Sequence, residues 1–272
     1  MSKKLSKAYS NKEFLNSHQA RAIRVQCELI EPEQRFKKEK VENTIVFFGS
    51  ARSKPLKDAK KELEAFKSKY SSEEKMNEDD IKELKKKERI VKLSKYYDEA
   101  VILSNKLTQW TENKKDSSNK YFVCSGGGPG MMEAANKGAF KANGKSVALG
   151  ISLPFEQGVN SYATPELSFE FHYFFLRKFY FLYHAKAVIV FPGGFGTMDE
   201  LFETLTLIQT RKLNKKMPII LYGKEFWQNL INFEQFIEWG VISPEDINLF
   251  KIVDDIENAF SIITKNIDSS TD

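Results

Sequence analysis

Two glycine-rich turns, each between a short apolar run and a helical pattern, constrain the fold of this 272-residue chain more than any other feature. The run 121–125 leads into SGGGPG at 125–130, and the run 187–191 leads into PGGFGT at 192–197. Glycines let the backbone approach a ligand closely, and the free amides and dipole of the following helix N-terminus favour a phosphate. Tight turns alone would explain either segment, but the pair at matching positions favours a phosphate or nucleotide site.

The same succession of strand, turn and helix repeats along the chain. Helical patterns fill most gaps between the strands, which predicts a Rossmann-like, doubly wound α/β fold with a parallel sheet and helices on both faces. Ligands bind such sheets at the carboxyl ends of the strands, where a third turn, GSAR at 49–52, also lies. We expect strands at Thr44–Phe48, Tyr121–Ser125, Ser146–Ile151, Ala187–Phe191 and Pro218–Tyr222. The candidate binding residues in the three turns are Gly49, Ser50, Ser125, Gly126, Gly127, Gly193, Gly194, Gly196 and Thr197.

We expect a single domain with additions in three places. Residues 1–43 are polar with few apolar positions, which indicates an arm or a helix lying on the body. Residues 44–225 would form the nucleotide-binding domain, interrupted by a charged helical insert at about 53–110. Residues 226–272 read as helices packed on the same domain, and the tail from Ile267 to Asp272 reads as disordered.

The insert carries most of the net positive charge. Between Lys54 and Lys95 there are 14 Lys and Arg against 10 Asp and Glu, which accounts for +4 of the net charge of +5. Apolar residues recur there at helical spacing, so we expect two helices with one apolar stripe each, joined by the polar segment from Ser71 to Asp80. Aromatic residues interleaved with arginine, which nucleic-acid stacking platforms need, are missing. We therefore interpret the charge as solvated helical faces and do not expect nucleic acid as a partner.

Composition excludes several other classes of protein. A chain that is 41% hydrophobic and 13% aromatic can bury a substantial core, which excludes global disorder. The sequence shows neither an apolar run of the ~20 residues that span a bilayer nor a signal peptide, so we expect a soluble, cytoplasmic protein with no membrane partner. Cys27 and Cys124 lie far apart and the three histidines are not paired at ligand spacing, which favours neither a disulfide scaffold nor a metal site. Neither glycine turn fits GxGxxG with its acidic partner, so we expect no NAD and no other cofactor.

Acidic residues just inside two of the helices are the first candidates for chemistry. Glu200 either completes a capping box with Thr197 at the start of its helix or faces the sugar of a bound ligand. Glu133, in the first helical turn after the loop 125–130, either accepts from ribose hydroxyls or complements the helix dipole. For Asp199 we expect only the dipole role.

The segment 169–185 is almost wholly aromatic and apolar apart from a few basic residues. Burying an unpaired guanidinium there would cost several kcal/mol, so Arg177 either binds the phosphate or carboxylate of the ligand or forms a structural ion pair. The segment ends just before the strand that leads into PGGFGT, which favours the ligand. His172 and His184 we expect to pack in the core or in an interface.

Together these motifs resemble the Lonely Guy family, the cytokinin riboside 5′-monophosphate phosphoribohydrolases, many bacterial members of which are labelled "possible lysine decarboxylase". The resemblance rests on GSAR, SGGGPGMMEAANKGA, the Arg177-Lys178 pair and PGGFGTMDELFE, and it runs from about Thr44 to Thr210 around the insert. The insert and the N-terminal arm make the chain similar to the longer bacterial branch rather than to the compact plant-type enzymes. That departure leaves the choice of substrate open.

The resemblance implies hydrolysis of the N-glycosidic bond of a nucleoside 5′-monophosphate, either a cytokinin riboside monophosphate or an AMP-like nucleotide, to free base and ribose 5-phosphate. It places the catalytic arginine and glutamate of the family on Arg177 and Glu200, and it implies a homodimer or larger homo-oligomer. The alternative is a non-catalytic nucleotide-binding or sensing protein, against which the presence of both residues argues. The nucleotide contacts fall on Glu133, Lys178, Gly193, Gly194, Gly196, Thr197 and Thr206.

Overall fold

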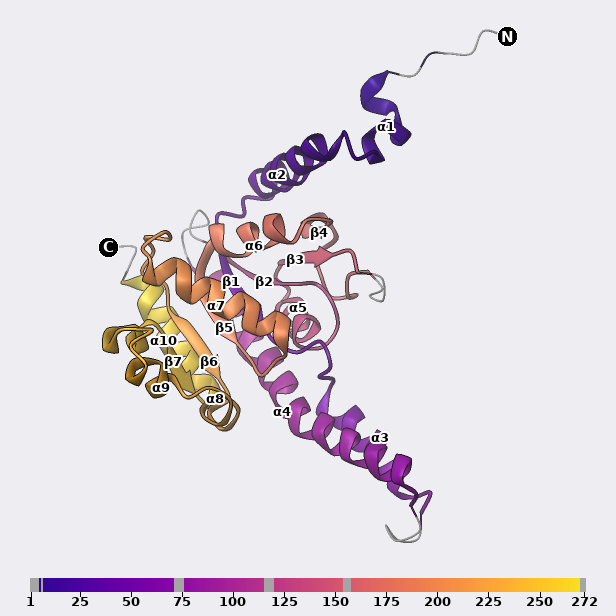
Figure 1. Cartoon of the computed structure of the whole chain (residues 1–272), viewed down its shortest axis with the longest axis vertical. Coiled ribbons are helices and arrows are strands. Elements are labelled where there is room, and N and C mark those ends of the chain that lie inside the picture. The colour runs from indigo at the N-terminus through magenta and orange to yellow at the C-terminus, as the bar shows by residue number, and fades with distance from the viewer. Residues whose placement is uncertain (1–4, 6, 71–75, 115–119, 154–157, 270–272) are drawn as a thin grey trace.

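We describe a computed structural model of the chain, which places residues 5, 7–70, 76–114, 120–153 and 158–269. Within these residues the strands form one sheet in which each neighbouring pair is parallel, in the order β4-β3-β2-β1-β5-β6-β7 (Figure 1). The expected Rossmann-like α/β fold is therefore confirmed. The strands are β1 (Asn43–Phe48), β2 (Tyr121–Ser125), β3 (Ser146–Ile151), β4 (Ser168–Phe171), β5 (Ala185–Val190), β6 (Ile219–Tyr222) and β7 (Lys251–Val253).

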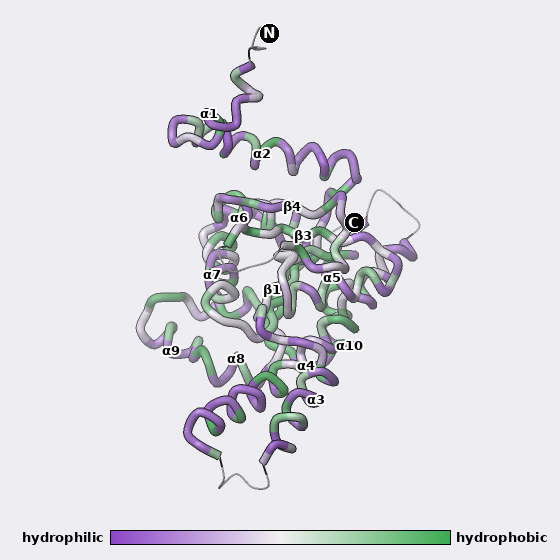
Figure 2. Tube along the Cα trace, turned by 90° about the vertical axis from the view of Figure 1, so that its right-hand side faces the viewer, coloured by the Kyte–Doolittle hydropathy of each residue, from purple (hydrophilic) through white to green (hydrophobic). Residues whose placement is uncertain are grey.

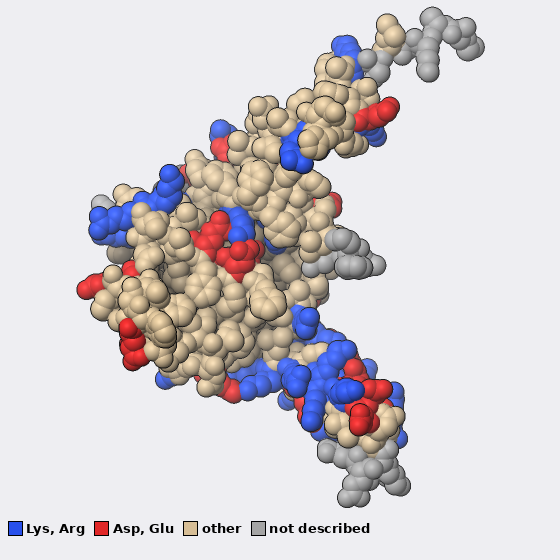
Figure 3. Space-filling model, in the orientation of Figure 1, with Lys and Arg blue, Asp and Glu red and all other residues tan. Residues whose placement is uncertain are grey.

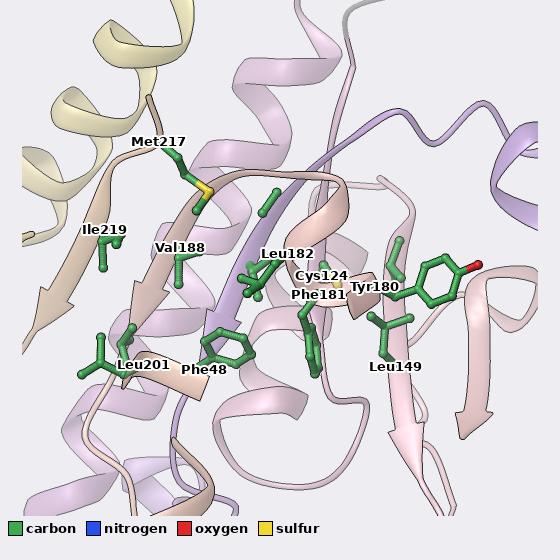
Figure 4. Close-up of a cluster of buried hydrophobic side chains, with 14 of the residues drawn as sticks. Phe48, Cys124, Leu149, Tyr180, Phe181, Leu182, Val188, Leu201, Met217 and Ile219 are labelled. Atoms are coloured by element: carbon green, nitrogen blue, oxygen red, sulfur yellow. The ribbon is translucent and has the colours of Figure 1, made fainter. Parts of the chain in front are cut away.

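Helices pack on both faces of this sheet. The helices of the described residues are α1 (Lys12–Asn16), α2 (Arg21–Lys38), α3 (Leu56–Lys67), α4 (Glu78–Glu112), α5 (Met131–Lys141), α6 (Phe174–Tyr183), α7 (Phe195–Gln209), α8 (Lys224–Leu230), α9 (Phe233–Glu238) and α10 (Ile256–Asp268). Side chains alternate between the two faces along a strand, so Phe47 of β1 joins the core under α4, α5 and α10, while its neighbour Phe48 joins the core under α6 and α7. Figure 4 shows Phe181 of α6 and Leu201 of α7 on the same side of the sheet as Phe48.

The order of the strands reverses at the middle of the sheet. From β1 the chain continues through β2 and β3 to β4 on one side, and then returns to place β5 on the other side of β1. The carboxyl ends of β1 and β5 thus form a topological switch point, the place where open α/β sheets bind ligands. Gly49 follows β1 and PGGFGT follows β5, so two of the three turns singled out in the sequence meet at this point.

Two strands are missing from the expected set, β4 and β7. Both are short and lie at the edges of the sheet, and β4 occupies the start of the aromatic segment 169–185. Three or four residues at an edge carry little alternation, which is why the pattern does not reveal them. The five expected strands are present, with boundaries that differ by up to two residues.

Helix α2 explains how the N-terminal residues meet the body. Phe36 near its C-terminal end is almost fully buried, and its ring makes edge contacts with Phe169 and Tyr180. The carboxylate of Glu28 accepts hydrogen bonds from the backbone amides of His172 and the next residue at 2.9 and 3.2 Å. The other end of α2 and α1 extend away from the body (Figures 1 and 2). The segment is thus both an arm and a helix on the body.

The insert folds as a helical hairpin that projects from the body, with α3 lying along the first part of α4 (Figure 1). Figure 2 shows the outer part of the hairpin as mostly hydrophilic. Helix α4 is 35 residues long, and its second half is buried against α5 through residues such as Tyr97 and Leu103. The expected second helix begins at Glu78, inside the expected linker from Ser71 to Asp80, of which 71–75 lie outside the described residues.

The C-terminal helix corrects the expectation of a disordered tail. Helix α10 continues to Asp268, and Ile267 is 4% exposed in the core under α10, so disorder from Ile267 onward is wrong for this part of the tail. Residues 270–272 lie outside the described residues. Across the parts of the chain that are described, none of the helices combines the length and the apolar character needed to cross a membrane.

Candidate active site

Ser50 ties the two glycine loops together at the switch point. Its backbone amide donates to the carbonyl of Pro192 at 3.1 Å, and its carbonyl accepts from the amide of Met131 at 3.0 Å. Gly130 has a φ of +70°, and a Cβ at this position would lie 2.4 Å from the carbonyl oxygen of Ser50. Only glycine permits this approach. The three turns therefore form one continuous rim at the carboxyl ends of β1, β2 and β5.

Hydrogen bonds within the protein hold the glycine loop 125–130 in place. The hydroxyl of Ser125 donates to Asn136 Oδ1 at 2.8 Å and accepts from the amide of Gly127 at 3.1 Å. Asn160 donates through Nδ2 to the carbonyl of Gly127 at 2.9 Å. Ser125 is fully buried, so the predicted substrate contact of its side chain would require the loop to open. Asn160 lies in an irregular segment without periodicity, so its contact with the loop could not be predicted from the sequence.

The loop 192–197 leads into helix α7, which starts earlier than expected. Its N-cap is Gly194, no side chain caps it, and Thr197 is already the third residue of the helix. The capping box of Thr197 and Glu200 is therefore wrong. Instead the Thr197 hydroxyl lies over Gly193, where a Cβ would be 2.1 Å from it. The first amides of a helix have no partner within it, so those of residues 195–197 are suited to bind an anion.

Arg177 of α6 and Glu200 of α7 come together under this rim. Nη1 of Arg177 lies 3.6 Å from Oε1 of Glu200, and their side chains are only 10% and 14% exposed. Nε of Arg177 donates a hydrogen bond of 2.7 Å to the carbonyl of Leu149 in β3, which fixes the guanidinium. A Cβ at Gly126 would lie 2.4 Å from Nη2 of Arg177, so the loop 125–130 passes directly over the arginine. The two predicted catalytic residues are thus adjacent and buried.

The environment of Glu200 favours its neutral form more than water does. Burial is the main cause that raises the pKa of Glu200 to about 7; the charge of Arg177 opposes this rise and the charge of Asp199 adds to it. A carboxyl with a pKa near the working pH can either accept or donate a proton in a reaction. Groups with strongly shifted pKa values are also common at functional sites.

Lys178 points away from Arg177, toward the outer side of α7. Its ammonium lies 2.8 Å from the carboxylate of Asp199 and 2.9 Å from that of Glu203. Burial disfavours the charge of Lys178, but these two carboxylates raise its pKa overall. Asp199 is therefore an ion-pair partner, where the sequence indicated only a dipole role. Figure 3 shows a compact red and blue group in a largely uncharged face over α6 and α7.

Thr206 lies two turns beyond Glu200 on the exposed side of α7. Together with Lys178 and Phe202 it lines an open hollow of about 560 Å³ between α6 and α7. Its hydroxyl donates to the carbonyl of Phe202 at 2.7 Å. The structure therefore brings Thr206 near Lys178 but not into the buried pair of Arg177 and Glu200.

Glu133 is engaged by the insert. Its carboxylate accepts a hydrogen bond from the hydroxyl of Tyr97 on α4, and Lys137 donates to the same hydroxyl at 3.4 Å. Burial and the neighbouring Glu133 raise the pKa of Tyr97, so its hydroxyl stays protonated and acts as a donor. The insert thus contacts a predicted nucleotide-binding residue. The contact between Tyr97 and Glu133 could not be predicted from the sequence because the two residues are 36 positions apart.

The two histidines beside the arginine segment differ in their surroundings. His184 is mostly buried, its ring packs edge-on against Phe36, and its Nδ1 lies 3.2 Å from the carbonyl of Glu42. Burial lowers the pKa of His184, which agrees with the expected packed histidine. His172 is exposed, so a place in the core is wrong for it. Among the described residues no group of three or more His, Cys, Asp or Glu is arranged as metal ligands would be.

Comparison with known proteins places this geometry in a family. A family model described as "Possible lysine decarboxylase" matches residues 132–263. A cytokinin riboside 5′-monophosphate phosphoribohydrolase of Arabidopsis thaliana is 30% identical over 158 residues, which cover 56% of this chain and 67% of the relative. A probable enzyme of the same name from Oryza sativa subsp. japonica is 35% identical over 91 residues, 33% of this chain and 37% of the relative. The chain thus aligns with little more than a third of the rice protein.

Among solved structures, the molybdenum cofactor binding protein of Rippkaea orientalis matches with a TM-score of 0.47 and 16% identity, over 83% of this chain and 98% of that one. The residues matched by the family model include the loop 192–197, Arg177 of α6 and Glu200 of α7, and they begin just after the loop 125–130. By its alignment with the Arabidopsis enzyme over two thirds of that enzyme, the chain belongs to the Lonely Guy family.

Proposed function

We propose that this chain hydrolyses the N-glycosidic bond of a nucleoside 5′-monophosphate, a cytokinin riboside monophosphate or an AMP-like nucleotide, to free base and ribose 5-phosphate. The observation that supports this most is the buried carboxyl of Glu200, with a pKa of about 7, beside Arg177 and one turn after the open amides of α7. The names of the curated relatives describe the same reaction.

The carboxylate of Glu200 supplies the chemistry. Breaking the bond between C1′ and the base nitrogen develops positive charge on the ribose, which a neighbouring carboxylate stabilises. The oxygen of a water molecule forms the new bond to C1′ while the electron pair of the broken bond leaves with the base. One proton of the water passes to Glu200 as general base, and Glu200 returns this proton to the base nitrogen as the base leaves.

Arg177 and the start of α7 hold the substrate in place for this step. The guanidinium is fixed by the carbonyl of Leu149, so it presents its remaining donors in one orientation. The amides of residues 195–197 and the helix dipole bind the 5′-phosphate. Fixing both ends of the ribose phosphate removes most of its orientational freedom before the reaction.

The surroundings of Lys178 do not favour the decarboxylation that the description of the family model names. A lysine that forms a Schiff base needs a lowered pKa so that its amine is neutral. The pairs with Asp199 and Glu203 raise the pKa of Lys178 instead. The lysine next to the proposed site is therefore suited to bind charge rather than to form a covalent bond.

We also propose that the chain acts as a homodimer or larger homo-oligomer. Helix α6 exposes Phe175, Phe179 and Tyr183, which recur every four residues and are 58%, 42% and 52% exposed, and Phe195 on α7 is 97% exposed. A row of large aromatic side chains on one face is typical of an association surface. We expect Phe179→Glu to lower the molar mass measured by light scattering, while Phe140→Glu, on α5 at the other face of the sheet, leaves it unchanged. An unchanged mass for both variants would contradict this surface.

The reaction is tested by product analysis on a panel of nucleotides. AMP, GMP, CMP, UMP and isopentenyladenosine monophosphate are incubated with the protein, and free base and ribose 5-phosphate are measured. The corresponding nucleosides serve as controls, because they lack the phosphate that the amides of α7 bind. Release from at least one nucleotide and not from its nucleoside supports the proposal. Binding of nucleotides without release of base from any of them would instead favour a nucleotide-sensing protein.

A further inference from the structure

A second cavity lies at the opposite end of the sheet from the proposed active site. It has a volume of about 600 Å³ and is bounded by the amino ends of β1, β2, β5 and β6. A strand of six residues spans about 17–20 Å, so this cavity is separated from the glycine loops by that length of sheet. The cavity is within the size range of sites for small metabolites.

The walls of this cavity are cationic and lack carboxylates. Lys186, Lys215 and Lys216 line it together with the side-chain amides of Asn214 and Asn266. Among the described residues, no Asp or Glu lies within ion-pair distance of any of the three lysines. Within the described part of the chain, the three lysines around this hollow thus have no carboxylate partner.

Several lysines of the insert, by contrast, have a carboxylate partner. Lys54 faces Glu62 at 2.7 Å and Lys67 faces Glu88 at 3.0 Å. In Figure 3 the hairpin is mixed red and blue, while the loop between α7 and β6 carries a blue group with little red beside it. The three lysines at the cavity therefore differ from these paired lysines of the insert.

Lys215 is the fixed member of the cluster. Its ammonium donates to the carbonyls of Leu182 and Tyr183 at the end of α6, at 3.2 Å in the case of Leu182. Burial lowers the pKa of Lys215, and the charge of Lys186 lowers it further. A bound anion would remove this repulsion, because it would lie between positive charges that the protein otherwise leaves facing one another.

The neighbouring surface indicates what else the ligand carries. A second hollow of about 380 Å³ shares Lys215, Lys216 and Asn266 with the first and continues to Leu249 and Phe250. A ligand that filled both would have a charged end among the lysines and a less polar body. Lysine binds phosphate as a point charge, and amide groups add donors.

We propose that this cavity binds a small, multiply charged phosphorylated molecule, at a site distinct from the glycine loops. The ligand has two or more negative charges on its phosphates, held by Lys186, Lys215 and Lys216, and its body extends toward Phe250. The site does not depend on the reaction proposed above.

Calorimetric titration with inorganic tripolyphosphate at about 150 mM salt tests the site. The variant Lys186→Gln/Lys216→Gln removes two cations and leaves Lys215, which also supports α6. We expect its affinity for tripolyphosphate to fall about tenfold or more. The matched control Lys82→Gln/Lys86→Gln, on the insert, removes the same charge from exposed positions and keeps the affinity. Equal affinities in both variants, or no binding to the unaltered protein, would overturn the proposal.

Hydrogen exchange separates this site from the glycine loops, which also bind phosphate under the proposed function. We expect tripolyphosphate to slow amide exchange in peptides that contain residues 214–217, and this protection to vanish in Lys186→Gln/Lys216→Gln. Protection confined to residues 192–200 would mean that the anion binds only at α7 and would overturn the proposal. Binding of a single-stranded RNA at the same salt, with no response to tripolyphosphate, would also overturn it in favour of a nucleic acid.

Discussion

Replacing Glu200 with glutamine is expected to stabilise the protein above neutral pH. The pKa of this carboxyl is raised from 4.5 to about 7, mainly by burial and against the effect of Arg177. A group whose pKa is raised by folding contributes its stability fully below the unfolded value of 4.5, and this stability is lost as the pH rises through 7. The shift corresponds to a loss of up to about 3 kcal/mol at pH 8. Glutamine has no charge to bury, so Glu200→Gln avoids this loss.

Urea unfolding at pH 5 and pH 8 measures the effect. At pH 5 the variant and the unaltered protein should have similar free energies of unfolding. At pH 8 Glu200→Gln should be more stable by up to about 3 kcal/mol, which would raise the melting temperature by about 5 to 10 °C. Asp199→Asn is the control, because it removes an exposed partner of Lys178 and should change stability by only about 0–1 kcal/mol. A variant that is less stable at both pH values would instead show that the carboxylate of Glu200 stabilises the fold.

Three further predictions concern the same site. If the ionised form of Glu200 is required, kcat/KM should rise with pH and level off above an apparent pKa of about 7, and a profile that falls over this range would contradict the general-base role. Gly126→Ala should push Arg177 from its place, since the new methyl group would lie 2.4 Å from Nη2, and lower kcat by about 10- to 100-fold with little change in melting temperature; unchanged kcat would show that the loop does not position the arginine. Tyr97→Phe removes the donor to Glu133 and should lower the free energy of unfolding by about 1 to 3 kcal/mol in urea melts, and an unchanged value would contradict that contact.

The central sheet is predictable because its strands carry their own signal. Ile45 and Phe47 alternate with Val46 and Phe48 between two buried faces, so β1 reads as a short apolar run followed by glycine. The edge strand β7 has three residues and one fully covered side chain, which is too little for a pattern. Local sequence therefore predicts the elements that are buried on both sides and misses those at the edge.

The pairing of residues within the site is less accessible to the sequence. The nearness of Arg177 to Glu200 depends on the packing of α6 beside α7, and the hold of Leu149 on the guanidinium depends on β3 ending beside it. The start of α7 at Phe195 moves Thr197 inside the helix, which the S/T-x-x-E spacing alone does not reveal. Motifs locate the candidate side chains, but only the tertiary structure shows which of them meet.

The most direct test of the central claim is turnover of the best nucleotide of the panel by Glu200→Gln compared with Asp199→Asn. Both variants change one acidic side chain at adjacent positions of α7, but only Glu200 is buried beside Arg177. We expect Glu200→Gln to lose about 10² to 10⁴ in the rate of base release while it still binds the nucleotide, and Asp199→Asn to stay near the unaltered rate. Full turnover by Glu200→Gln would show that Glu200 is not the general base.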